Sequence, residues 1–145
     1  MLESIILTLA VFSSLFSQHR VLPNLENLPT LEIGKVVFNI EIADSEVERA
    51  QGLSGRTSLP LDQGLLFEFS TANWPGFWMK DMNFPIDIVW INENWQIVDL
   101  TKNFEPKSYP QIIFPKSAVK YVLEINADLI NKNDFKIGDE VIFKP

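Results

Sequence analysis

The chain has no cysteine, and its single histidine is His19, near the amino end. The absence of cysteine excludes disulfides, thiolate nucleophiles and cysteine-ligated zinc or iron–sulfur sites. A domain that begins after His19 also lacks an imidazole, which excludes Ser-His-Asp and Cys-His catalytic machinery and histidine-bound metals. Carboxylates, lysine and tyrosine remain for proton transfer. We therefore predict no metal and no cofactor, and we favour a protein that is not an enzyme.

The sequence also lacks a run of basic residues. It contains 12 Lys and Arg against 19 Asp and Glu, which gives a net charge of −7. A protein with this charge is repelled by phosphate backbones, so we expect no binding to nucleic acid.

One long apolar run lies at the amino end, over residues 5–16. It is shorter than the roughly 20 residues that cross a bilayer, and it resembles the apolar region of an export signal or a short membrane anchor. Glu3 and the absence of a basic residue before the run are atypical of a signal, so a buried core helix is an alternative. We expect residues 1–18 to be a signal peptide or anchor, an extracytoplasmic location, and contact with a membrane only through this segment.

Residues 19–34 contain Pro23 and Pro29 and are predicted to be a tether. The rest, residues 35–145, has the length of one domain, and a hydrophobic content of 46% is enough to form a core. We therefore predict a single domain after the tether.

The apolar residues of this domain alternate with polar ones, as in half-buried strands. Ser45 and Glu48 form the pattern of a capping box, which predicts a short helix that ends at Gly52. A second short helix is expected over residues 127–132, and Asn92-Glu93-Asn94 indicates a hairpin. The predicted strands cover residues 35–42, 64–69, 77–80, 86–92, 95–101, 119–125 and 140–144.

Many short strands and two short helices favour a mainly β fold, of the β-rich α+β class. We expect a single curled antiparallel sheet or an open barrel. The one long connection, residues 103–117, is expected to be either a functional lid or disordered.

Several segments resemble one family in both order and spacing. They are residues 48–53 (ERAQGL), Arg56 with Leu59, and residues 64–69 (GLLFEF), 77–91, 121–124 (YVLE) and 138–141 (GDEV). Over residues 36–141 the chain resembles the domain of unknown function family 192, whose members are small bacterial and archaeal proteins that often carry an export leader. The resemblance implies one compact β-rich domain and implies no particular reaction.

Two residues of the run 77–91 are candidates for ligand binding. Trp78 and Lys80 are two apart and share one face of the predicted strand, whereas Phe77 and Met79 share the other. An aromatic ring beside a cation suits a sugar or a carboxylate-bearing ligand. The alternative is that Trp78 belongs to the core and Lys80 extends past it to water.

Asp87 is surrounded in sequence by isoleucine and valine, and an unpaired buried carboxylate is costly. We therefore expect a cation to hold it, with Arg49, Arg56 or Lys80 as candidates, either as a structural pair or as the anchor of a site. Glu124 is a second carboxylate that could face Asp87 across the sheet. Two such carboxylates are the groups that glycoside hydrolases use.

These residues support three hypotheses of function. The preferred one is a non-catalytic module that binds a glycan or peptide through Trp78, Lys80, Arg49 and Arg56, braced by Asp87. The alternative is a carboxylate-dependent hydrolase that acts on cell-envelope polymers through Asp87 and Glu124. The third is an accessory protein that docks another envelope protein.

Overall fold

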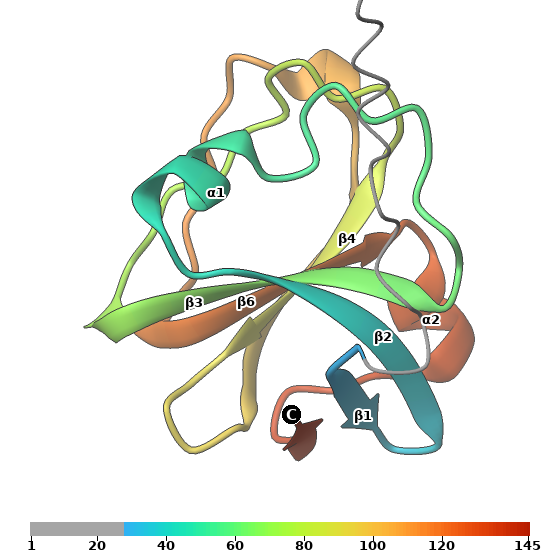
Figure 1. Ribbon diagram of the computed structural model, residues 1–145, viewed down its shortest axis with the longest axis vertical. Helices are drawn as coiled ribbons and strands as arrows, with labels where there is room; N and C mark the ends of the chain where they lie inside the picture. Colours follow the sequence, from blue (N-terminus) through green and yellow to red (C-terminus); the bar gives the residue numbers. More distant parts are fainter. Residues whose placement is uncertain (1–27) are drawn as a thin grey trace, which may run out of the picture.

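The computed structural model describes residues 28–145 (Figure 1). The predicted signal or anchor lies outside the described residues. Within residues 28–145, no helix combines the length and the apolar character that a membrane span requires. The elements are β1 (Thr30–Ile33), β2 (Val36–Ala43), α1 (Glu46–Gln51), β3 (Gln63–Asn73), β4 (Ile86–Ile91), β5 (Ile97–Phe104), the 3₁₀ turn η2 (Pro106–Ser108), β6 (Val119–Asn126), α2 (Leu129–Asn133) and β7 (Val141–Lys144).

The seven strands form one strongly curled half-barrel sheet in the order β5-β4-β6-β3-β2-β1-β7. Its two edge strands approach each other at one end, where Gln96 and Glu140 form an isolated bridge. The mainly β fold with two short helices is confirmed. The sheet is mixed, however, because β2 and β3 run parallel, and α1 lies in the connection between them. The expected antiparallel pairing holds at the other strand pairs of residues 28–145 and fails only at this one.

Several predicted details of the strands and turns differ from the structure. The last residues of the predicted tether form β1, which pairs with both β2 and β7, so the sheet begins at Thr30. Residues 77–80 are not a strand, because only Phe77 pairs, in an isolated bridge with Ile113. The hairpin between β4 and β5 is present, but the positive φ falls on Trp95 (58°) rather than on an asparagine.

Each face of the sheet carries its own apolar cluster. Along β6, Tyr121, Leu123 and Ile125 belong to the first cluster, and Val122 belongs to the second. The first cluster also contains residues of β1, β7 and α2, and the second contains Phe77 and Met79. Figure 1 shows α1 beyond one side of the sheet, and β1 with the C-terminus on the other. The two faces of the sheet are thus covered by different segments of the chain.

Candidate functional site

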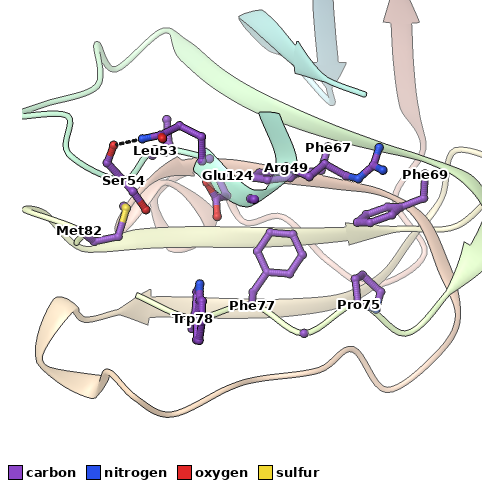
Figure 2. Close-up of a pocket in the computed structure, with 14 residues that line it drawn as sticks. Arg49, Leu53, Ser54, Phe67, Phe69, Pro75, Phe77, Trp78, Met82 and Glu124 are labelled. Atoms are coloured by element: carbon purple, nitrogen blue, oxygen red, sulfur yellow. Dashed lines mark hydrogen bonds between the residues drawn. The ribbon is translucent and has the colours of Figure 1, made fainter. Parts of the chain in front are cut away.

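A cavity of about 320 Å³ opens on the face of the second cluster (Figure 2). In Figure 2, α1 and the residues after it form one wall, and the segment around Phe77 and Trp78 forms the opposite wall. Phenylalanines, a tryptophan, a leucine and a methionine supply the large apolar side chains of the lining, and the charged groups are Arg49 and Glu124. The large apolar lining residues are Leu53, Phe67, Phe69, Phe77, Trp78 and Met82, and Ala50 and Pro75 also line the cavity.

The α1 wall is fixed by the capping box that the sequence predicts. The Ser45 hydroxyl accepts a hydrogen bond from the Glu48 amide (3.2 Å), and the Glu48 carboxylate accepts from the Ser45 amide (3.1 Å) and hydroxyl (2.7 Å). The bonds from Ser45 hold the pKa of Glu48 below its ordinary value. The helix ends at Gly52, whose φ of 50° favours glycine. The chain therefore turns at Gly52, and the residues that follow α1, Leu53 and Ser54, line the cavity.

Arg49 lies at the Phe69 end of the cavity. Its Nη1 donates to the backbone carbonyls of Asp44 and Glu68, the second at 2.9 Å. The guanidinium carbon lies 5.2 Å from the centre of the Phe69 ring. These contacts connect α1 to the residue that follows β2 and to β3, and both hydrogen bonds of Nη1 are therefore made within the protein.

The opposite wall turns one aromatic ring inward and the next one outward. The backbone of Phe77 pairs with Ile113 through two bonds of 2.9 Å, and its ring packs edge to face on Phe67 and Trp90. Trp78 is 48% exposed, with the Lys80 ammonium 5.7 Å from its ring centre and Tyr109 beside it. The predicted alternation of faces is therefore correct, although this segment is not a strand.

Glu124 lies at the floor of the cavity. It sits on β6 between Leu65 of β3 and Ile88 of β4, its partners in the sheet. The residue is 5% exposed, and its Oε2 has no hydrogen-bond partner within residues 28–145. Burial raises the pKa of Glu124 to about 8, although the positive charge of Arg56 acts in the opposite direction. A mostly apolar cavity thus ends at a carboxyl group whose Oε2 has no hydrogen-bond partner within residues 28–145.

Arg56 is paired with a different carboxylate from the one we expected. Its two terminal nitrogens bind the two carboxylate oxygens of Glu41 at 2.6 and 2.9 Å. The bond to Glu41 raises the pKa of Arg56. Arg56 does not line the cavity, so its effect on the site is the field it exerts on Glu124.

Asp87 lies on the opposite face of the sheet from Glu124. In the pairing of β4 with β6, Ile88 is opposite Glu124 and Asp87 is opposite Ile125, so the two carboxylates point to different sides. Asp87 is fully buried and accepts hydrogen bonds from the backbone amides of Asn103 and Ile130, both at 2.8 Å. The predicted pairing of Asp87 with an arginine or with Lys80 is therefore wrong.

The structure thus brings together part of the predicted set. Trp78, Arg49 and Glu124 line the cavity, and Lys80 lines a neighbouring groove that shares Trp78 with it. Asp87 and Arg56 lie outside both. Sequence reasoning missed the inward ring of Phe69 and the side chain of Met82. No local signal marks these two, because the cavity forms only when residues distant in sequence meet.

The comparisons with known proteins agree with this fold. The model of the DUF192 family of uncharacterized ACR proteins matches residues 30–143. The chain belongs to the DUF192 family. The resemblance predicted from the sequence is thereby confirmed. No curated protein matches this DUF192 chain.

Two crystal structures are similar to this DUF192 domain. One is a provisionally named transcription regulator from Sinorhizobium meliloti 1021, with 28% identity, a TM-score of 0.74, and coverage of 79% of this chain and 91% of that one. The other is a protein of unknown function from Novosphingobium aromaticivorans DSM 12444, with 27% identity, a TM-score of 0.70, and coverage of 79% and 82%. These likenesses support the fold and assign no ligand.

Proposed function

We propose that this domain is a non-catalytic module that binds a peptide or glycan in the cavity above Glu124 and in the adjoining groove past Trp78 and Lys80. One observation carries the proposal. Glu124 is buried, its Oε2 has no hydrogen-bond partner within residues 28–145, and it lines an open cavity. A ligand group that hydrogen-bonds this carboxyl would offset the cost of its burial.

The shape of the site supports a ligand longer than the cavity itself. The groove that begins at Trp78 contains Ser54, Lys80 and Asp81, and it continues from the α1 wall of the cavity. An extended chain could place one group on Glu124 and lie across the half-exposed ring of Trp78. Concave, mostly apolar sites with few polar groups are typical of ligand binding.

The geometry gives less support to the hydrolase hypothesis. Glycoside hydrolases flank one bond with two carboxyl groups, whereas Asp87 and Glu124 point to opposite faces of the sheet. The two bonds from backbone amides also engage both carboxylate oxygens of Asp87. This pair therefore cannot act on one glycosidic bond.

The name of the Sinorhizobium protein raises the question of DNA binding. A net charge of −7 disfavours contact with phosphates, and we propose that this chain does not bind nucleic acid. We also propose an extracytoplasmic location, from the apolar character of residues 5–16.

A glycan and peptide binding screen on the full chain tests the proposed function. Trp78→Ala should weaken the binding of any hit by at least about tenfold, because a half-buried aromatic anchor is lost. Trp74→Ala is the matched control, since Trp74 is 61% exposed and does not line the cavity. Equal effects of the two substitutions, or the absence of any hit, would contradict the proposal.

A further inference from the structure

We propose that the cavity receives a basic side chain of a peptide, a lysine or arginine, whose apolar stem packs on the cavity walls and whose cationic end pairs with Glu124. This inference rests on the proposed function and names the ligand class for the same site. The carboxyl group at the floor carries the inference, because it is enclosed by apolar neighbours and Oε2 has no hydrogen-bond donor within residues 28–145.

The walls suit the stem of such a side chain. Phe77 presents its ring from one wall, and Leu53 and Met82 contribute further apolar surface. A cation that passes aromatic rings is also attracted by their electron-rich faces. The cavity volume of about 320 Å³ lies near the lower limit of ligand pockets, which is about 300 Å³. This size favours one side chain over a whole sugar polymer.

Two cations of the described residues, Arg49 and Arg56, lie near Glu124 or line the cavity, and both have partners within the protein. Nη1 of Arg49 donates to two backbone carbonyls and its guanidinium lies over Phe69, while Arg56 forms a two-bond pair with Glu41. Arg56 lies close enough to lower the pKa of Glu124, yet it leaves Oε2 without a bond. An ammonium or guanidinium group from a ligand would supply the missing donor.

Few charged groups lie near Glu124 among the described residues. Its sheet partners Leu65 and Ile88 are uncharged, and Lys80 and Asp81 lie in the outer groove rather than in the cavity lining. The chain as a whole carries a net charge of −7, which attracts cationic ligands. Arg49 and Arg56 are therefore the two cations of the described residues that would repel a basic ligand at this site.

A pH dependence of known sign follows from this arrangement. Because the pKa of Glu124 is raised to about 8, the free carboxyl is mostly protonated at neutral pH and must release a proton when a cation binds. Affinity for a cationic ligand should therefore rise by up to about tenfold per pH unit below that pKa, and then level off. A ligand that accepts a hydrogen bond from the neutral acid should show the opposite trend.

Calorimetric titration of the full chain with capped peptides tests the inference. The peptides share one sequence and differ at a central position that carries lysine, arginine, norleucine, glutamine or glutamate. We expect lysine and arginine peptides to bind at least about tenfold more tightly than the norleucine peptide, which keeps the stem and lacks the charge. Their affinity should rise between about pH 6.5 and pH 8, with proton release on binding.

Glu124→Gln should remove both the preference for a basic side chain and the pH dependence. Glu93→Gln removes one acidic charge from the exposed hairpin turn and is the matched control, which should leave both unchanged. The peptide series on the unmodified protein is decisive even if the Glu124 variant folds poorly.

Two outcomes would overturn the inference. If the norleucine or glutamine peptide binds as tightly as the lysine peptide, the cavity accepts a side chain but does not select a cation, and the proposed binding function stands. If a glycan binds through Trp78 and no basic peptide does, the ligand class is wrong while the binding site is retained.

Discussion

Asp87 and Glu124 are two buried carboxylates on neighbouring strands, one position apart in the register, and their surroundings differ completely. Asp87 faces the cluster that contains Ile130 of α2, and two backbone amides bind its two oxygens. Glu124 faces the cavity, and its Oε2 is unpaired within residues 28–145. The same residue chemistry therefore has a structural role on one face and a proposed binding role on the other.

This difference shows that burial alone does not identify a functional carboxylate. A buried charge with its hydrogen bonds satisfied stabilises one arrangement of the chain, because it joins segments that are distant in sequence. Asp87 joins β4 to the end of β5 and to the first turn of α2. An unsatisfied group beside an open cavity has no such role, and ligand binding provides a reason for it.

The largest effect that we predict is the loss of stability on Asp87→Ala. The substitution leaves the amides of Asn103 and Ile130 buried without an acceptor, at a cost of about 1 to 3 kcal/mol each, so we expect about 4 kcal/mol in total. Asp87→Asn keeps one acceptor oxygen, so its loss in free energy of unfolding should be roughly half of the loss expected for Asp87→Ala. Urea denaturation measures both. Ligand binding to the folded fraction should be unchanged, and lost binding at unchanged stability would reverse the assignment.

Glu124→Gln should raise the free energy of unfolding, whereas the substitutions of Asp87 lower it. The folded-state pKa of about 8 exceeds the ordinary value of 4.5, so the protonated acid contributes stability that is fully present below pH 4.5 and is lost as the pH rises through 8. The variant cannot ionise, so it should exceed the original chain in stability by up to about 4 kcal/mol near pH 8 and show a flatter pH profile. Urea midpoints from pH 4.5 to 8.5 test this. A profile that is equally steep in both proteins would mean that Glu124 is solvated.

The sequence was sufficient to predict much of the fold for local reasons. The capping box of Ser45 and Glu48 and the alternation of β2 and β6 depend on residues that are close along the chain. The parallel pairing of β2 with β3 depends on how the chain returns after α1, and alternation does not encode direction. β1 was missed because it is short and follows Pro29.

The candidate site was predicted less completely, for a physical reason. The predicted alternation correctly separates Trp78 from the buried Phe77 and Met79. Glu124, a candidate from the sequence, lines the cavity, and its role stays a prediction. The face on which Asp87 lies follows from the register between β4 and β6, which sequence cannot supply. Its partners are backbone amides, and every residue carries one, so no residue type marks them.

Asp99→Asn tests whether the sheet face of a buried carboxylate or its hydrogen-bond partners determine its contribution to stability. Asp99 is opposite Trp90 in the β4–β5 pairing and so shares the Glu124 face, but it accepts bonds from the amides of Leu100 (2.9 Å) and Lys116 (3.0 Å). The amide side chain keeps one acceptor, so we expect a loss of about 1.5 kcal/mol by urea denaturation. A gain of stability, as expected for Glu124→Gln, would show that the face rather than the partner decides the role.

The smallest predicted effect concerns Gly52, which keeps the cavity wall open. Its φ of +50° is strained for alanine, and an added Cβ would lie 3.3 Å from the ring of Phe67, a residue of the cavity lining. We expect Gly52→Ala to lose about 1 kcal/mol of stability and to weaken ligand binding.

Gly34→Ala is the matched control, because Gly34 has a φ of +61° and no atom within 4 Å of the added Cβ. It should lose about 1 kcal/mol of stability through its positive φ, without any change in binding. A loss of binding in Gly52→Ala that Gly34→Ala does not show then reports the contact with Phe67. If both variants bind ligand as the original chain does, the wall at Gly52 does not shape the binding site. The proposal that the face of Glu124 is the binding face, unlike the face of Asp87, would then have less support.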